Sequence, residues 1–385
     1  IINGWLKSLD CQATLRALEI LGVKFKSLAA DALLVQGVGL YGLQAPNKVI
    51  DAGNSGTTMR LLSGILAAQA FDSVIVGDAS LSKRPMQRVI EPLQLMGAKI
   101  NAVNDNYAPL NIIGKQKLKS IDYTLPVASA QVKSALLLAD LYAQKTTKIT
   151  EPQPTRNHTE LMLVYFEANK HKPLTLQIPG DISSAAFFIV AASIAPTSDL
   201  LIKNIGINPT RTGFIEIMRR MGANIKIDNI KIQNNELSAD IRVKASKLRA
   251  INIPEELVPN AIDEFPALAI AAACASGTTV IRGARELRYK ESDRIQALAA
   301  GLNNLDIITE TFADGLAITG GKILGGVVDS FGDHRIAMAF AMAGLVAQDQ
   351  IVVQNTCNIA TSFPDFVSIA RQAGLQIVSE ESCYV

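Results

Sequence analysis

The alternation of apolar and polar positions along the chain predicts a repeated α/β unit. In each copy an amphipathic helix ends at a glycine, and a short strand rich in β-branched residues follows. Glycine suits this turn because it readily adopts the left-handed conformation that ends many helices. Repeats of this length indicate duplicated α/β units. The clearest copies lie at 15–23, 92–100 and 215–223, and looser copies lie at 298–307 and 369–378.

A second kind of helix recurs between these copies. It is apolar on nearly every face and opens with small polar residues. Because a helix without a polar face is normally buried, we expect each unit to contain one half-exposed helix, one buried helix and intervening strands. The predicted buried helices span 55–68, 129–139, 183–195, 263–275 and 333–345.

One copy departs from the pattern. After the apolar run 161–166 we expect a glycine turn and two strands, but the polar run 167–173 follows at once. Either this unit is shortened or residues are missing from the sequence. The first residues, from Ile1 to Trp5, also read as the middle of a strand, without an initiator methionine.

The length of 385 residues favours two domains. Pro179-Gly180-Asp181 falls midway, so we predict domains over 1–178 and 179–385, with an active site in the cleft between them. The segment that starts at Asp181 also fits a simple helix cap. With 49% hydrophobic and 19% charged residues, the chain has enough apolar side chains for a large core.

Composition restricts the function. A net charge of +2 argues against a nucleic-acid-binding surface, which needs clustered basic residues. The apolar runs are too short to span a bilayer, and the three histidines are too scattered for a histidine-rich metal site. The four cysteines lack metal-ligand spacing, so we expect reduced thiols in a cytoplasmic protein: Cys11, Cys274, Cys357 and Cys383.

The stretch from Asp51 to Arg60 leads into an apolar helix and contains the loop Gly53-Asn54-Ser55-Gly56. Small residues let the backbone approach a ligand closely, and the first N–H groups of a helix have no partner within it. Such a loop therefore suits an anion, although it also fits an ordinary helix cap.

Charged residues cluster at 288–294, and this cluster leads into a predicted helix. Positions 291, 295, 298 and 302 fall on one helical stripe, so Glu291 points inward at the helix start and Arg294 shares that side. The same residues also fit an exposed network of caps and i,i+3 ion pairs.

Three other helix starts carry charge. His334 and Arg335 follow Asp333 in a predicted buried helix and need either an anionic ligand or a neighbouring carboxylate. Lys83 and Arg84 precede Pro85, which we place at a first helical position; this also fits a solvated helix start. Asp263-Glu264 opens a further buried helix, where capping is the simpler explanation.

If these helix starts converge between two domains, the cleft selects anions, and Asp263 and Glu291 remain for proton transfer. The sequence contains no GxSxG, Walker or zinc motif. It therefore predicts a metal-free enzyme that acts on small phosphorylated or carboxylated molecules.

Five segments, in order along nearly the whole chain, closely resemble the 5-enolpyruvylshikimate-3-phosphate (EPSP) synthase family. The related UDP-N-acetylglucosamine enolpyruvyl transferases lack the Lys-Glu-Ser-Asp-Arg pattern. The matching segments are Gly53-Asn54-Ser55-Gly56-Thr57-Thr58-Met59-Arg60, Arg84-Pro85-Met86, Ala128-Ser129-Ala130-Gln131, Lys290-Glu291-Ser292-Asp293-Arg294 and Gly332-Asp333-His334-Arg335.

The resemblance implies an α/β fold of two similar domains, each with three βαβαββ units, arranged as an inside-out α/β barrel. It implies transfer of the enolpyruvyl group of phosphoenolpyruvate to the 5-hydroxyl of shikimate 3-phosphate, with release of phosphate through a tetrahedral intermediate. It also implies no metal or organic cofactor. We expect a monomer whose partners are these two substrates, with neither nucleic acid nor membrane.

The resemblance also implies the site residues. Asp263 would accept the 5-hydroxyl proton, and Glu291 would handle the proton at the methylene carbon, with His334 nearby. Shikimate 3-phosphate would contact Ser129, Gln131, Arg156, Asp263 and Lys290. Phosphoenolpyruvate would contact Gly56, Arg84, Gln131, Arg294 and Arg335.

The chain departs from the family in two places. The family begins with a Lys-Ser-x-Ser-x-Arg segment that binds both substrates, and this sequence starts after it; without that segment we expect little activity. Thr361 precedes Ser362-Phe363-Pro364 where some members have a lysine, which removes one expected phosphate contact. Gly56 leaves room at the phosphate site, so we expect inhibition by glyphosate.

Two other functions remain open from the sequence. One is enolpyruvyl transfer to a sugar nucleotide. The other is a non-catalytic binding or scaffold protein that kept the repeats, although a scaffold has no reason to retain buried charge at Arg84, Asp263, Glu291, Arg294 and Arg335.

Overall fold

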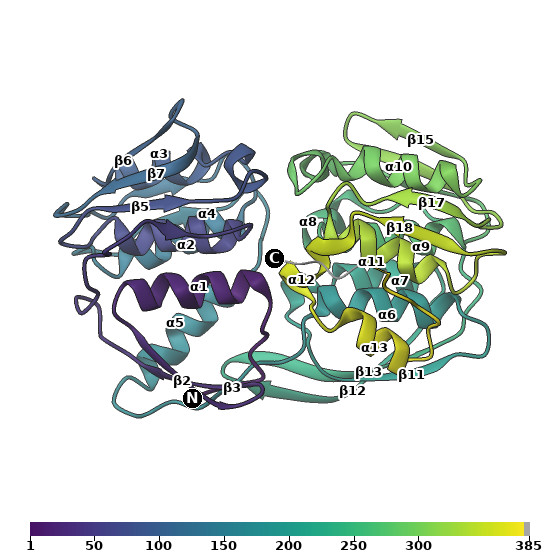
Figure 1. The fold of residues 1–385 in the computed structure, drawn as a ribbon, viewed down its shortest axis with the longest axis horizontal. Helices are drawn as coiled ribbons and strands as arrows, with labels where there is room; N and C mark the ends of the chain where they lie inside the picture. The colour runs from purple at the N-terminus through teal and green to yellow at the C-terminus, as the bar shows by residue number, and fades with distance from the viewer. Residues whose placement is uncertain (381–385) are drawn as a thin grey trace. The chain divides into compact units, whose positions relative to one another are not determined.

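The computed structural model describes residues 1–380. Internal contacts divide the chain into two compact units, the first over Ile1–Ile178 and the second from Pro179 onward (Figure 1). The division falls directly before Pro179-Gly180-Asp181. Each unit has its own sheets and its own hydrophobic core.

The first unit contains three sheets and five α-helices over residues 1–178. The sheets have the strand orders β10-β1-β3-β2, β4-β5-β7-β6 and β8-β9. The strands are β1 (Ile2–Asn3), β2 (Lys24–Ala29), β3 (Ala32–Gln36), β4 (Ile50–Asp51), β5 (Ser73–Val76), β6 (Lys99–Val103), β7 (Tyr107–Ile113), β8 (Asp122–Thr124), β9 (Lys148–Thr150) and β10 (Leu176–Gln177). The helices are α1 (Leu9–Ile20), α2 (Gly56–Leu66), α3 (Gln87–Leu95), α4 (Ala130–Asp140) and α5 (His158–Ala168).

The second unit also contains three sheets among its described residues, with the orders β11-β13-β12, β14-β16-β15 and β17-β18. The strands are β11 (Asp199–Gly206), β12 (Asn224–Gln233), β13 (Glu236–Lys244), β14 (Thr278–Ile281), β15 (Thr309–Phe312), β16 (Gly315–Thr319), β17 (Gly326–Asp329) and β18 (Ile351–Gln354). The helices are α6 (Ile182–Ile194), α7 (Gly213–Arg220), α8 (Val258–Ala261), α9 (Phe265–Ala273), α10 (Arg294–Asn304), α11 (His334–Ala343), α12 (Ile359–Ser362) and α13 (Phe366–Gln372).

Both units repeat one sheet pattern, a parallel pair extended by an antiparallel hairpin. In the first unit β4 pairs parallel with β5, and β5 and β6 both pair antiparallel with β7. In the second unit a parallel bridge joins Asn252 to Val280 of β14, and β14 and β15 both pair antiparallel with β16. This repetition confirms the predicted duplication of α/β units.

The five predicted buried helices are confirmed as α2, α4, α6, α9 and α11, with ends within two residues of those predicted. In the second unit α6, α9 and α11 pack against one another, and every residue of α9 is buried. The apolar faces of these helices are buried against one another and against the sheets of this unit (Figure 1). The polar residues that open these helices are thereby held at fixed positions.

The glycine turns are confirmed at four copies. The φ angles of Gly22, Gly97, Gly222 and Gly374 are +90°, +104°, +95° and +100°. In the looser copy at 298–307 Asp306 takes this position with a φ of +65°. The strand expected after Gly374 is wrong, since residues 375–380 form no strand.

The irregular copy in the first unit consists of α5, a turn and the two-residue strand β10, which pairs parallel with β1. None of the α5 residues is fully buried. The two strands that follow the helix in other copies are therefore replaced here by a single short one.

Two further expectations concern cysteines and membranes. Cys11 and Cys274 carry free thiols, but Cys357 is disulfide-bonded, so the expectation of four reduced thiols is wrong there. Spacing along the chain does not reveal which thiols meet in space. The expectation for Cys383 lies outside the described residues. Among residues 1–380, no helix combines the length and the apolar character that spanning a membrane requires.

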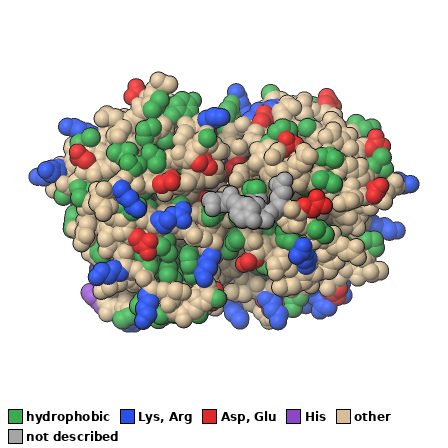
Figure 2. All heavy atoms as spheres, in the orientation of Figure 1, with side chains coloured by type: hydrophobic (Ala, Val, Ile, Leu, Met, Phe, Trp, Pro, Cys, Tyr) green, Lys and Arg blue, Asp and Glu red, His purple; other side chains and the backbone are tan. Residues whose placement is uncertain are grey.

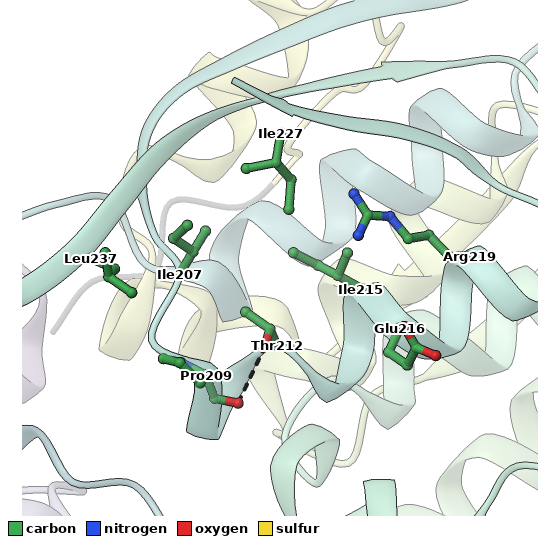
Figure 3. A pocket seen from close by; sticks show the side chains of 8 residues that line it. All are labelled: Ile207, Pro209, Thr212, Ile215, Glu216, Arg219, Ile227 and Leu237. Carbon is green, nitrogen blue, oxygen red and sulfur yellow. Dashed lines mark hydrogen bonds between the residues drawn. The ribbon is translucent and has the colours of Figure 1, made fainter. Parts of the chain in front are cut away.

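The surface shows little segregation of charge on the face in Figure 2, where Lys and Arg side chains are interspersed with Asp and Glu. The second unit also contains a cavity of about 310 Å³ beside α7, β12 and β13. Its lining is mainly apolar and includes none of the predicted site residues (Figure 3). Predicted site residues lie instead at the starts of helices, among them α2, α4, α10 and α11.

Candidate functional site

Arg294 is the centre of a charged cluster in the second unit. It is the first residue of α10, whose N-cap Asp293 accepts a hydrogen bond from the Gln296 amide. The Arg294 side chain is only 1% exposed. Its Nε donates to Asp333 Oδ2 over 2.8 Å, and its Nη2 donates to Glu291 Oε2 over 2.5 Å. One buried guanidinium thus joins two carboxylates from different segments.

Asp263 is the third carboxylate of this cluster. Its Oδ1 lies 3.6 Å from Arg294 Nη1 and accepts a hydrogen bond of 3.0 Å from Lys290 Nζ. Arg335 Nη1 donates to the Asp263 backbone carbonyl over 3.1 Å. Asp263 does not cap α9, because the N-cap residue is Glu264 and it makes no side-chain cap bond. The capping explanation for Asp263 is therefore wrong.

Asp333 links the start of α11 to Arg294. It is fully buried, and its carboxylate accepts hydrogen bonds from the Arg335 amide and from Ser292 Oγ as well as from Arg294. Burial alone would raise the pKa of Asp333, but the charge and hydrogen bonds of Arg294 outweigh burial and hold the pKa below its usual value. Burial likewise opposes the charged form of Arg294, while Asp333 and Glu291 raise its pKa further. Both groups are charged at neutral pH.

His334 lies beside this cluster as the first residue of α11 and is 8% exposed. Burial, reinforced by the charge of Arg335, lowers its pKa to about 4. The imidazole is therefore neutral at physiological pH. A neutral imidazole supplies one hydrogen-bond donor and one acceptor without adding charge to the cluster.

One donor of the cluster remains unused. Arg294 Nη1 is buried and makes no hydrogen bond within residues 1–380, although it lies 3.6 Å from Asp263 Oδ1. A buried guanidinium N–H without a hydrogen bond is unfavourable, and an oxygen of an anionic ligand would satisfy it. The unused donor therefore favours a ligand with carboxylate or phosphate oxygens beside Asp263 and Glu291.

The first unit has a second cluster at the start of α2. Ser55 caps the helix by accepting from the Thr58 amide. Arg60, one turn later, donates from Nη1 to Gln131 Oε1 over 2.7 Å, and Gln131 Nε2 donates to Thr57 Oγ1 over 2.8 Å. These bonds tie the N-terminal turns of α2 and α4 together.

Gly56 lies against two guanidinium groups. A Cβ atom at this position would lie 2.8 Å from Arg60 Nη1 and 3.1 Å from Arg84 Nη1. The first turn of α2 therefore presents backbone N–H groups and two arginines at one place, a combination that suits an anion.

The start of α4 adds further predicted residues. Ser129 is its N-cap and accepts from the Val132 amide, and Gln131 is its second residue. Arg156 lies in the segment between β9 and α5. This segment is fastened because Glu151 Oε1 accepts a hydrogen bond of 3.2 Å from the Thr155 amide.

The structure thus places Gly56, Arg84 and Gln131 together in the first unit, with Ser129 next to Gln131. In the second unit it gathers six predicted residues, which are Asp263, Lys290, Glu291, Arg294, His334 and Arg335. In the described part of the chain, no three or more His, Cys, Asp or Glu side chains are arranged to hold a metal ion.

Two local predictions are wrong. Glu291 lies in the segment before α10, so it reaches Arg294 from outside the helix and shares no helical stripe. Pro85 precedes Met86, the N-cap of α3, and so is not a first helical residue. In both cases the N-cap is a later residue, so the helix begins later in the chain than predicted.

Two contributors were not predicted as site residues, Arg60 and Asp333. Arg60 follows Gly56 by four positions and therefore lies on the same helical face, which is the signal that marks it. Asp333 was expected only to open a helix, and its ion pair with Arg294 spans 39 positions.

Comparisons with known proteins identify the family. The family model "EPSP synthase (3-phosphoshikimate 1-carboxyvinyltransferase)" matches residues 1–369. The chain is 53% identical to the 3-phosphoshikimate 1-carboxyvinyltransferase of Methylococcus capsulatus, with coverage of 98% of this chain and 89% of the relative. The corresponding relative from Legionella pneumophila is 52% identical, with coverage of 98% and 90%.

Solved structures agree. The EPSP synthase of Acinetobacter baumannii superimposes with a TM-score of 0.85 at 49% identity, over 97% of this chain and 89% of that one. The enolpyruvyl transferase NikO of Streptomyces tendae shares the fold, with a TM-score of 0.75 at 16% identity, over 97% and 88% of the two chains. This chain therefore belongs to the EPSP synthase family, the 3-phosphoshikimate 1-carboxyvinyltransferases of the shikimate pathway.

Proposed function

We propose that this chain transfers the enolpyruvyl group of phosphoenolpyruvate to the 5-hydroxyl of shikimate 3-phosphate. The observation that carries the proposal is the Arg294 cluster, which places Asp263 and Glu291 on one buried guanidinium that still has an unused donor. Carboxylates held in this way suit proton transfer, and the unused donor suits a substrate oxygen.

The anionic groups of phosphoenolpyruvate fit the arginine-rich positions. Gly56, Arg84 and Gln131 are assigned to it in the first unit, and Arg294 and Arg335 in the second. Arginine matches carboxylate and phosphate oxygens with paired hydrogen bonds that lysine cannot form. Shikimate 3-phosphate is assigned to Ser129, Gln131, Arg156, Asp263 and Lys290.

The reaction proceeds in two steps in this proposal. In the addition step, the 5-hydroxyl oxygen forms a bond to C2 of phosphoenolpyruvate, its proton passes to Asp263, and Glu291 supplies a proton to C3. In the elimination step, Glu291 removes a proton from C3, the double bond re-forms and the C2–O bond to phosphate breaks. The proton that Asp263 accepted leaves with the phosphate, so both carboxylates return to their starting states. The intermediate is a tetrahedral, highly anionic species, which preorganised guanidinium groups stabilise.

His334 lies nearby as a neutral imidazole, because its pKa of about 4 keeps it unprotonated at neutral pH. It would orient a neighbouring group by hydrogen bonding without competing with the arginines for the anionic substrates. Its role in this proposal is therefore polar support of the proton-transfer region.

Phosphate release by the full-length gene product tests the proposal. Release should require both phosphoenolpyruvate and shikimate 3-phosphate, and Glu291→Gln should lower kcat by about 10²- to 10⁴-fold because general acid–base catalysis is lost. Glu310→Gln, the same change at an exposed position of β15, is the matched control and should retain full activity. An intact, folded protein that releases no phosphate from the two substrates would refute the assignment.

A further inference from the structure

A buried lysine of the first unit has no role in the proposed chemistry. Lys133 lies on α4, and its side chain is 6% exposed. Its Nζ lies 2.9 Å from Glu151 Oε2 and 2.6 Å from Glu160 Oε1. Burying an ammonium group is unfavourable unless carboxylates compensate its charge. These two ion pairs supply that compensation for Lys133.

The two carboxylates enclose the segment that carries Arg156. Glu151 directly follows β9, and Glu160 lies in the first turn of α5. Lys133 therefore fixes both ends of the stretch from residue 151 to residue 160. A single side chain on α4 is thus paired with both ends of this stretch.

Three further hydrogen bonds fasten the same stretch. The second oxygen of Glu151, Oε1, accepts from both the amide and the hydroxyl of Thr155, the residue before Arg156. Ser134, next to Lys133 on α4, shares a hydrogen bond of 2.7 Å between its Oγ and Thr159 Oγ1. Arg156 is thus held between fastened positions on both sides.

The same helix presents Ser129 and Gln131 at its N-terminus, one turn before Lys133. We propose that Lys133, acting through Glu151, is a positioning residue that sets Arg156 in place for shikimate 3-phosphate. On this inference α4 supplies two substrate ligands directly and orients a third. The inference rests on the proposed function, specifically on the role of Arg156.

The physical reason is preorganisation. A loop that is already ordered before the substrate arrives loses little conformational freedom on binding, whereas a loose loop must be ordered at the expense of affinity. Without Lys133, Glu151 and Glu160 would be two like charges with no common cation, and the stretch around Arg156 would lose its fixed ends. Affinity for shikimate 3-phosphate should fall, while the chemistry at bound substrate should continue.

The test uses Lys133→Met and Glu151→Gln in the full-length gene product. Calorimetry without phosphoenolpyruvate should show that Kd for shikimate 3-phosphate rises about 10- to 100-fold in both variants, as expected for misplaced binding groups. At saturating shikimate 3-phosphate, kcat and the KM for phosphoenolpyruvate should stay within about twofold of the parent values. A purely structural lesion would instead lower the active fraction without this separation.

Lys170→Met is the matched control. Lys170 also pairs with a glutamate, Glu167 at the end of α5, but the two side chains are 54% and 72% exposed. This variant should keep the parent Kd and both KM values. If Lys133→Met fails to fold, the nearly isosteric Glu151→Gln decides the question.

Arg156→Gln, measured alongside, tests the role of Arg156 separately from the positioning role of Lys133. If it leaves the Kd for shikimate 3-phosphate unchanged, the role of Arg156 is wrong and the positioning inference falls with it. If it weakens binding while folded Lys133→Met and Glu151→Gln bind normally, only the positioning inference is overturned. Phosphate release from the two substrates by the parent protein tests the proposed function independently of either result.

Discussion

The two candidate clusters both form at the starts of buried helices, but they are built from different groups. In the second unit Arg294 lies within the core and contacts Asp333, Glu291 and Asp263. In the first unit the start of α2 presents backbone N–H groups, and Arg60 donates to the neutral amide of Gln131. The second cluster therefore matches proton transfer, and the first matches anion binding.

The difference also concerns stability. The charges of the second cluster compensate one another inside the core, so removing one leaves the others buried and unbalanced. The groups at Gly56 lie at a helix end whose space is limited mainly by flexible side-chain ends. Changes in the second cluster should therefore affect folding, whereas changes at Gly56 should affect substrate binding.

The largest expected effect is that of Arg294→Met. Removing the guanidinium leaves three carboxylates without their common cation, and breaking a buried ion pair in this way costs about 3–5 kcal/mol. Urea unfolding followed by a probe in the second unit should show this loss. Arg220→Met removes an exposed i,i+4 pair with Glu216 in the same unit and should cost less than about 1 kcal/mol.

Equal stability losses in the two arginine variants would contradict the view that the second cluster is part of the core. A loss in Arg294→Met that disappears when Asp333 is also replaced by Asn would sharpen it, because the unbalanced charge would then be the cause.

The second expected effect is acid sensitivity through His334. Its pKa is lowered to about 4 in the folded chain, against an ordinary value of 6.5. Between these values the unfolded chain binds a proton that the folded chain does not, so stability falls as the pH drops through this range. The full shift corresponds to a loss of about 3 kcal/mol by pH 4.

Thermal unfolding at pH 7 and pH 5 checks this expectation. His334→Asn should reduce the loss of stability on acidification, and His171→Asn, an exposed position in the first unit, should leave it unchanged. A His334 variant with the same acid sensitivity as the parent would show that other groups control it.

The same two clusters show what the sequence can and cannot predict. The residues at the helix starts were predictable, since buried helices opening with Gly, Ser or Asp next to Arg or His stand out in the pattern. The partners were not predictable, because Arg294 and Asp333 lie 39 positions apart and only folding brings them together. Lys133 was missed because it lies in a helix predicted to be buried, and helix periodicity says nothing about Glu151.

The residue at which each helix begins was harder to predict. Asp293 caps α10, so Glu291 lies outside the helix, yet it still reaches Arg294. Glu291 therefore points toward Arg294 as expected, but from the segment before the helix and not from within it. The repeated α/β units were predictable because repeated periodicity and glycine turns reflect local backbone rules, which do not depend on distant partners, whereas the barrel arrangement was implied only by the family resemblance.

The smallest expected effect on stability, and the sharpest test of the first cluster, is that of Gly56→Ala. The new Cβ would lie 2.8 Å from Arg60 Nη1 and 3.1 Å from Arg84 Nη1, so both guanidinium groups must shift. They are the ends of flexible side chains, so stability should change by less than about 1 kcal/mol, because alanine is favoured over glycine within a helix. The displaced donors should raise the KM for phosphoenolpyruvate about tenfold, since small misplacements of binding groups are costly.

Steady-state kinetics with each substrate varied in turn measures this effect. Inhibition of the parent protein by glyphosate separately tests the expectation that Gly56 leaves room at the phosphate site. Gly53→Ala is not a suitable control, because Gly53 has a φ of +55° and alanine would strain the backbone there. Gly344→Ala fits better: Gly344 has a right-handed conformation as the C-cap of α11, outside the first cluster. If Gly56→Ala destabilises the chain strongly and leaves the KM for phosphoenolpyruvate unchanged, the start of α2 is a packing site, and the contrast between the two clusters is lost.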